Sequence, residues 1–228
     1  MSLFAIGDLH LSTSVDKPMD VFNGWENYVE RLKLNWKNKI KDEDTIVLDG
    51  DISWGISLEQ AKEDFSLINS LPGKKIILKG NHDYWWTTKS KMENFFELNC
   101  FNTLKILNNN HYKYEGFGIC GTRGWINETN VEADKKVLLR EAGRLNNSII
   151  SAKKDGLSPI VFLHYPPIYA SDYNYEILEV LHNHDIKQCY YGHIHGKGCD
   201  YAINGERDGI NYTLISSDFL QFSPIKIK

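Results

Sequence analysis

Lys79-Gly80-Asn81-His82-Asp83-Tyr84, at residues 79–84, is the stretch that decides which fold this sequence predicts. It follows an apolar run at residues 75–78, which indicates a short buried strand that Gly80 ends. An amide, an imidazole and a carboxylate therefore stand side by side where a strand gives way to a loop. In open α/β sheets, ligands bind at this edge, beyond the carboxyl ends of the strands. Further polar clusters follow similar runs elsewhere in the chain, and this repetition points to a shared site.

The N-terminal half alternates strands and helices around this stretch. Apolar runs at residues 3–6 and 45–48 predict two more short strands. Apolar residues at helical spacing predict helices over about residues 24–40 and 57–70, and Ser57 has the character of an N-cap for the second. Because strands and helices alternate, the pattern predicts a parallel sheet with right-handed crossovers.

The pattern changes after a helix predicted over residues 88–98. Three short runs, at 104–107, 112–114 and 118–120, are separated by Asn- and Gly-rich turns and predict antiparallel pairing. A long helix over 132–154, a strand over 159–163, a helix over 175–182 and a strand over 188–191 follow. The tail predicts strands at 212–215 and 222–227, with Asn204-Gly205 as a hairpin turn. Since no repeat or linker interrupts the pattern, we expect residues 1–228 to form a single domain.

Composition narrows the class of protein. The formal net charge of −4 gives no basic field, so nucleic acid polymers are not favoured as partners. The four cysteines lack zinc-finger spacing and are expected to be free thiols. The N-terminus lacks the basic start of a secretion signal, and no apolar stretch approaches the roughly 18 residues of a membrane span. These features lead us to expect a cytoplasmic protein with no membrane association.

The polar residues at the predicted strand ends have the make-up of a metal site. They are Asp8, His10, Asp51, Asn81, His82, His164, His193 and His195. In an extended segment, residues two apart point to the same side, so His193 and His195 can converge on one point. Imidazole with carboxylate and amide oxygen suits Mn, Fe, Zn or Ni, whereas a closed structural zinc site would use cysteine. Each residue alone has an ordinary explanation as a turn or cap, and their joint occurrence favours a two-metal site.

These residues resemble the motifs of the calcineurin-like metallophosphoesterases. The matching motifs are Asp8-Leu9-His10, Gly50-Asp51, Gly80-Asn81-His82-Asp83, His164 and Gly192-His193-Ile194-His195, in the order of that family. The resemblance implies a mixed α/β fold, a four-layer αββα sandwich of two mixed β-sheets flanked by helices. It also implies two divalent metal ions at the strand ends, with manganese as our first expectation.

The resemblance assigns ligands residue by residue. Asp8, His10 and His195 would hold one ion, Asn81, His164 and His193 the other, and Asp51 would bridge them. Spacing alone does not choose between Asp49 and Asp51, and the Gly-Asp pattern of the family selects Asp51. Two such ions would activate a water molecule to attack phosphorus. His82 is similar to the non-ligand histidine of the family, which would stabilise or protonate the leaving group.

The chain departs from the protein-phosphatase branch of the family. That branch carries an Asp and an Arg three and four residues after the bridging Asp, where this chain has Trp54 and Gly55. A Ser/Thr protein phosphatase is therefore not favoured, and the sequence leaves open which residue orients His82. Asp83 is adjacent, but we expect it to point elsewhere.

Candidate substrate contacts lie near the motifs. Trp54 and Tyr84 are either packing residues or a wall on which a flat group stacks. Arg123, on a glycine-flanked turn, would bind a second phosphate or a carboxylate. We therefore expect hydrolysis of a small phosphomonoester or phosphodiester, nucleotide-like substrates included. The alternatives are a nuclease of the same family and a non-catalytic metal-binding scaffold, and the oligomeric state is open.

Overall fold

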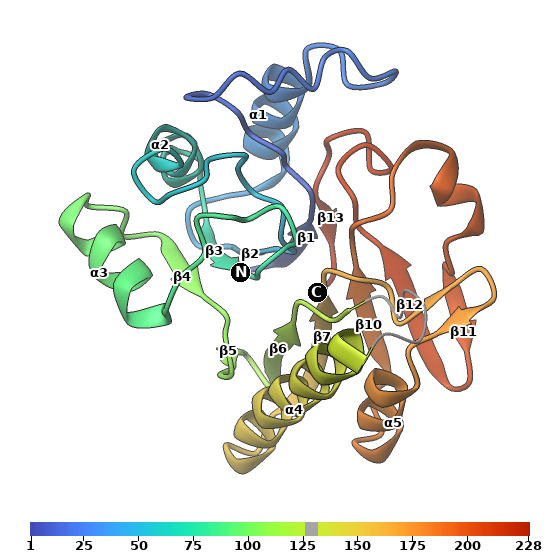
Figure 1. Cartoon of the computed structure of the whole chain (residues 1–228). Helices are drawn as coiled ribbons and strands as arrows, with labels where there is room; N and C mark the ends of the chain where they lie inside the picture. Colours follow the sequence, from blue (N-terminus) through green and yellow to red (C-terminus); the bar gives the residue numbers. More distant parts are fainter. Residues whose placement is uncertain (126–131) are drawn as a thin grey trace. The chain divides into compact units, whose positions relative to one another are not determined.

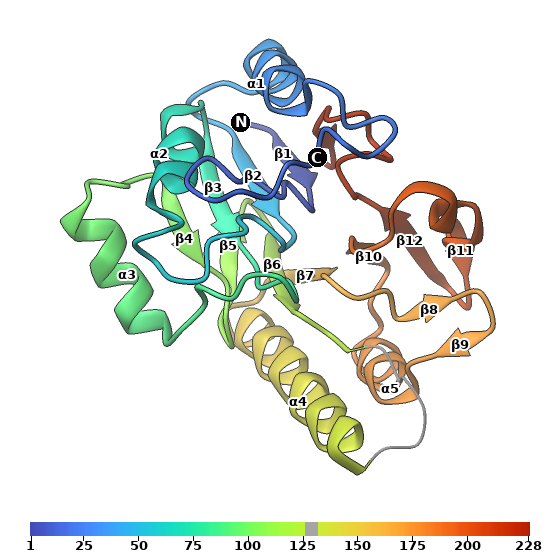
Figure 2. The same ribbon diagram turned by 45° about the horizontal axis from the view of Figure 1, so that its top comes forward.

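The chain folds into two compact units, each with its own sheet and hydrophobic core. The computed structural model describes residues 1–125 and 132–228, with side chains of the last segment described from residue 134 onward. The first unit comprises residues 1–106 and 215–228, and the second unit comprises residues 107–214. Figures 1 and 2 show the elements of both units.

A five-stranded sheet in the order β13-β1-β2-β3-β4 forms the centre of the first unit. The strands are β1 (Leu3–Ile6), β2 (Thr45–Leu48), β3 (Lys74–Ile77), β4 (Leu104–Ile106) and β13 (Ile225–Lys226), and the helices are α1 (Tyr28–Lys39), α2 (Lys62–Ser70) and α3 (Lys89–Leu98). Neighbours from β1 to β4 pair in parallel, and β13 is antiparallel to β1. All four residues of β1 are buried, as is typical of parallel strands covered on both faces.

Local sequence explains the helices of the first unit. α1 buries Tyr28, Leu32 and Trp36, which recur every four residues and so form one apolar face. The indole Nε1 of Trp36 donates to the carbonyl oxygen of Pro72 at 2.9 Å, which attaches α1 to the turn before β3. Thr88 caps α3 by accepting a hydrogen bond from the amide of Lys91 at 3.4 Å.

The second unit contains a six-stranded sheet in the order β11-β12-β10-β7-β6-β5. Its strands are β5 (Tyr112–Tyr114), β6 (Phe117–Thr122), β7 (Ser158–Leu163), β10 (Gln188–Tyr191), β11 (Gly205–Arg207) and β12 (Ile210–Leu214), with a separate pair β8 (Ile168–Tyr169) and β9 (Asp172–Tyr173). The helices are α4 (Glu132–Lys154), α5 (Tyr175–Asn183) and the 3₁₀ helix η1 (Gly196–Tyr201). The four inner strands are parallel, and the edge strands β5 and β11 are antiparallel.

Helix packing closes the core of the second unit. α4 packs against β6 and β7 and also contacts α5 (Figure 1), while Figure 2 shows β8 and β9 as a separate ribbon. Leu145 and Ile149 of α4 are fully buried in this core. The side chain of Asn174 caps α5 by accepting from the amide of Ile177 at 3.1 Å.

The expected fold class is confirmed, since the chain is a mixed α/β protein with two large mixed sheets flanked by helices. Three local predictions were wrong. β4 pairs in parallel with β3 rather than antiparallel with β5. The β11–β12 hairpin turns at Asp208-Gly209, where both residues have positive φ (52° and 77°), instead of at Asn204-Gly205. α2 begins at Lys62, while Ser57 accepts from the amide of Gln60 in a preceding turn.

Within the described residues, no helix has the length and apolar character needed to cross a bilayer.

Candidate metal centre

Three parallel strands of the first unit deliver the predicted ligands at one edge of the sheet. Asp8 follows β1, Asp51 follows β2, and Asn81 follows β3, and the register aligns the last residues of these strands. Two hydrogen bonds tie the first two loops together. The amide of Asp8 donates to the carbonyl of Gly50, and the amide of His10 donates to the carbonyl of Asp51, each at 2.9 Å. The first and second loops therefore run side by side beyond the sheet.

The backbone is strained at the residues expected to bind metal. Asp8, His10 and Asp51 have φ values of 57°, 45° and 50°, and in the second unit His193 has 71°. Non-glycine residues rarely adopt this left-handed region, and each instance costs on the order of 1 kcal/mol or more. Such strain persists where the surrounding structure fixes it, and it concentrates at functional sites.

The buried carboxylate of Asp83 fixes the Asp51 loop, a role that the sequence analysis missed. Asp83 accepts hydrogen bonds from the amides of Asp51 (2.9 Å), Ile52 (2.8 Å) and Gly80 (2.7 Å). It also accepts one from the indole of Trp85 at 3.0 Å. Through these contacts Asp83 holds the loops after β2 and β3 in one geometry.

The carboxylate of Asp51 is closely surrounded by the loop after β3 and by His10. Its Oδ1 accepts a hydrogen bond from the amide of His82 at 2.7 Å, and its Oδ2 lies 3.7 Å from Nε2 of His10. A Cβ at Gly80 would come within 2.0 Å of Asp51 Oδ1, so only glycine fits there. The glycine of the decisive stretch is therefore explained by the close approach of the Asp51 carboxylate.

Three carboxylates, those of Asp8, Asp49 and Asp51, are buried together in the first unit. Burial, followed by repulsion from the Asp8 and Asp51 carboxylates, raises the pKa of Asp49 well above its usual value. Buried groups of like charge are stable in a protein only when they are neutralised, paired or bound to a cation. A divalent ion beside Asp8 and Asp51 would neutralise the negative charge of this cluster.

His82 is surrounded by aromatic side chains. Its ring lies 4.5 Å from the ring of Trp54, and its Nδ1 is 3.3 Å from the hydroxyl of Tyr84. Trp54 also stacks on His10, with centroids 5.0 Å apart and planes 25° apart. A side chain at Gly55 would approach the backbone nitrogen of Ala61 to 2.7 Å, so the arginine of the protein-phosphatase branch would not fit at this position.

The second unit contains three of the histidines expected to bind metal, together with Arg123. His164 follows β7 and His193 follows β10, and their rings are 5.1 Å apart in an edge-on arrangement. The amide of Gly192 donates to the carbonyl of His164 at 3.2 Å, which joins the two loops. His195 lies at the start of η1. Arg123 follows β6, the strand beside β7, so it leaves the same edge of the sheet.

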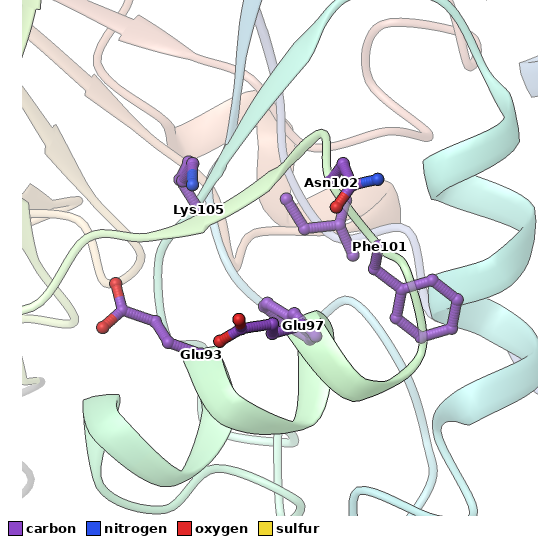
Figure 3. A pocket seen from close by; sticks show the side chains of 7 residues that line it. Glu93, Glu97, Phe101, Asn102 and Lys105 are labelled. Atoms are coloured by element: carbon purple, nitrogen blue, oxygen red, sulfur yellow. The ribbon is translucent and has the colours of Figure 1, made fainter.

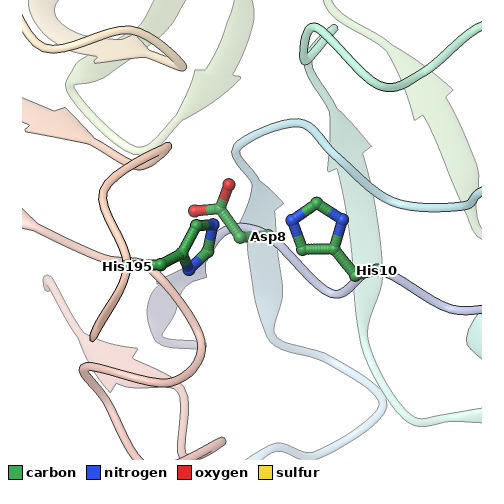
Figure 4. A group of neighbouring side chains, drawn as sticks. All are labelled: Asp8, His10 and His195. Carbon is green, nitrogen blue, oxygen red and sulfur yellow. The ribbon is translucent and has the colours of Figure 1, made fainter. Parts of the chain in front are cut away.

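The donor chemistry of these residues suits divalent ions. Figure 4 shows the carboxylate of Asp8 and the imidazoles of His10 and His195. Two groups have the donors to hold an ion, one made of Asp8, His10 and His195 and the other of Asp51, His164 and His193. Carboxylate oxygen and imidazole nitrogen without thiolate are the ligands of Mn, Fe, Zn and Ni. All four cysteines are free, in agreement with this donor choice.

A hollow elsewhere on the first unit involves none of the predicted site residues. It has a volume of about 230 Å³ and lies between α3 and β4 (Figure 3). Its polar lining residues are Glu93, Glu97, Asn102 and Lys105. This lining has no histidine, so the hollow lacks the imidazole donors of the strand-end residues.

Comparisons with known proteins place the chain in a family. The sequence model described as calcineurin-like phosphoesterase matches residues 1–197. No curated protein matches the sequence. A solved structure of a protein of unknown function from Aquifex aeolicus has a TM-score of 0.54 and 15% identity, covering 99% of this chain and 95% of that one. One from Thermus thermophilus has a TM-score of 0.54 and 12% identity, covering 86% of this chain and 82% of that one. At these identities the structural likeness establishes the fold alone.

Proposed function

The chain belongs to the calcineurin-like phosphoesterases, and from this premise we propose that it hydrolyses a small phosphomonoester or phosphodiester with two divalent ions. Membership and the candidate ligand groups support a metal-dependent phosphoesterase in general. The observation that carries the finer proposal is the set of carboxylate, amide and imidazole side chains at the strand ends, with strained backbone at four of them. Manganese is the ion we propose first, with Fe, Zn or Ni as alternatives.

The proposed ligands fall into three groups by role. Asp8, His10 and His195 would hold one ion, Asn81, His164 and His193 the other, and Asp51 both. When bound, such ions polarise the phosphoryl oxygens and lower the pKa of water to near neutrality. The protein's own part is to present these donors without rearrangement. Asp83 does this for Asp51 by accepting the amide hydrogen bonds of that loop.

His82 is the proposed general acid, and its neighbours supply the orientation that a carboxylate gives elsewhere in the family. Its amide donates to Asp51, which fixes the backbone beside the bridging ligand. Trp54 packs against one side of the ring, and the Tyr84 hydroxyl lies 3.3 Å from Nδ1. We assign the Tyr84 hydroxyl as the donor to Nδ1, so that Nε2 carries the proton that passes to the leaving oxygen. Trp54 and Tyr84 are proposed as substrate contacts as well, a role that the 58% exposure of Tyr84 supports.

Substitution of His82 tests catalysis separately from metal binding. We expect His82→Ala to bind manganese in the same ratio as the unaltered protein, measured by mass spectrometry of the metal content. Hydrolysis of p-nitrophenyl phosphate or bis(p-nitrophenyl) phosphate should fall by about 10²-fold or more, the usual contribution of a general acid. His193→Ala is the matched control, because it should lose metal as well as activity.

Three results would contradict the proposal. Unchanged turnover in His82→Ala would remove that residue from its role. Metal binding without hydrolysis in a broad phosphoester screen would favour the scaffold alternative, and digestion of labelled single-stranded DNA would favour the nuclease.

We also propose a cytoplasmic location, which the four free thiols support, because disulfides are rare in reducing compartments.

A further inference from the structure

Arg123 and His164 leave adjacent strands at the same edge of the second sheet. In the register of β6, β7 and β10, Leu163 aligns with Thr122 on one side and Tyr191 on the other. The next residues on β6 and β7 are therefore Arg123 and His164. The amide of Tyr165 donates to the carbonyl of Arg123 at 2.8 Å, which continues the pairing beyond the strands. Neighbouring strands are roughly 4.8 Å apart, so the backbone of Arg123 lies beside that of His164, a proposed metal ligand.

The guanidinium of Arg123 is largely buried, and in the described part of the chain not all of its N–H donors have a hydrogen-bond partner. Its side chain is only 15% exposed, and its Nη2 lies 3.7 Å from Oε1 of Glu141. Among the described residues, its buried Nε has no hydrogen-bond partner. Burial lowers the pKa of Arg123, while the charge of Glu141 opposes that change. A buried donor without a partner costs free energy that an incoming acceptor would recover.

Glu141 does not need Arg123 for its own hydrogen bonds. This fully buried carboxylate accepts from the hydroxyl of Thr122 at 2.5 Å and from Nη1 of Arg144 at 2.6 Å. Arg144 is thus its close charge partner, and the 3.7 Å contact with Arg123 is longer than a hydrogen bond. Arg123 is therefore held by Glu141 and remains able to bind another anion.

Aromatic rings fix the plane of the guanidinium and link it to the histidines. Arg123 lies over the indole of Trp125, 4.5 Å from the ring centroid. Trp125 packs edge-on against Tyr165 with centroids 5.5 Å apart, and Tyr165 is 4.3 Å from the ring of His193. A stacked guanidinium keeps its edge free, and that edge matches two oxygens of a phosphate or carboxylate.

We propose that Arg123 binds a second oxyanion of the substrate, a phosphate or a carboxylate carried by the group attached to the phosphoester. This inference rests on the proposed phosphoesterase function and names the substrate class: phosphoesters whose leaving group bears another acidic group. Trp125 and Tyr165 form the wall along which that leaving group lies.

Three inert analogues test the proposal by direct binding. Benzylphosphonate carries one anionic group, 4-carboxybenzylphosphonate adds a carboxylate, and p-xylylenediphosphonate adds a second phosphonate. Their dissociation constants are measured by titration calorimetry on the manganese-loaded protein. We expect at least one of the two analogues with a second acidic group to bind about tenfold tighter than benzylphosphonate, as befits a hydrogen bond to a charged group. Which of the two gains more identifies the oxyanion.

Two arginine variants separate a specific contact from a general effect of charge. Arg123→Gln should remove the preference for the second anion and leave benzylphosphonate binding within about twofold. Arg140→Gln removes the same charge from an exposed residue of α4 that also acts electrostatically on Arg123, and it should keep the preference. If Arg123→Gln does not fold, as judged by circular dichroism, Arg123→Lys decides, because an ammonium lacks the two-pronged edge and should lose most of the preference.

Two results overturn the inference. One is equal affinity of the three analogues for the unaltered protein, and the other is equal loss of preference in the Arg123 and Arg140 variants. Failure of the proposed function is distinguishable from both. In that case benzylphosphonate does not bind and neither p-nitrophenyl ester is hydrolysed.

Discussion

The hydroxyl of Tyr84, 3.3 Å from Nδ1 of His82, yields a prediction about leaving groups. A general acid matters more when the departing alcohol is a poor leaving group. We expect Tyr84→Phe to lower kcat for phenyl phosphate by roughly three- to tenfold, a small part of what a general acid contributes. The kcat for p-nitrophenyl phosphate should change by less than about twofold. Equal losses with both esters, or a change confined to KM, would leave Tyr84 as a substrate contact with no part in orienting His82.

Single residues also show what sequence can reveal about this site. The residues expected to bind metal are chemically distinctive and follow apolar runs, which was enough to group Asp8 with His164. The choice of Asp51 over Asp49 needed the Gly-Asp pattern of the family. The link that Asp83 makes to the Asp51 loop could not be predicted, because the amides of Asp51 and Ile52 are more than 30 positions away. Its one local signal is its place directly after Asn81-His82.

At the scale of elements, the contact between β6 and α4 depends on a small residue. A Cβ at Gly118 would lie 2.4 Å from the Cβ of Ala152, so Gly118→Ala should lower the free energy of unfolding by about 1–3 kcal/mol. Adding Ala152→Gly should restore part of that loss. Gly143→Ala in α4 is the control, since nothing lies within 4 Å and alanine should stabilise the helix by about 0.5–1 kcal/mol. Urea unfolding measures all three, and a tolerated Gly118→Ala would refute the packing argument.

Elements differ in how far sequence determines them. The long apolar face of α4 is visible along 23 residues, and its bounds were predicted as the structure has them. The direction of β4 was not predictable, because a three-residue strand carries no signal for its partner and local turns suggested the next strand instead. The hairpin was misplaced because two turn dipeptides compete, and only Asp208-Gly209 has the two positive φ values of a tight hairpin turn.

For the whole molecule, we propose that residues 1–228 unfold as a single domain. The first unit is built from both ends of the sequence, so the second unit is an insertion within it. Tryptophan fluorescence of Trp125→Phe reports on the first unit alone, because the other five tryptophans lie there. Far-ultraviolet circular dichroism reports on the helices of both units. We expect coincident urea transitions by both probes in metal-free protein, and separated midpoints would show two independent domains.

The pairing of β13 with β1 has a consequence for biosynthesis. The antiparallel neighbour of β1 emerges from the ribosome only after the 108 residues from 107 to 214. At roughly 5–20 residues per second, β1 waits about 5–20 seconds with one open edge after β4 has been made. An unpaired edge is a template for association with other nascent chains. We therefore expect the open edge of β1 to be a point at which chaperones engage the nascent chain.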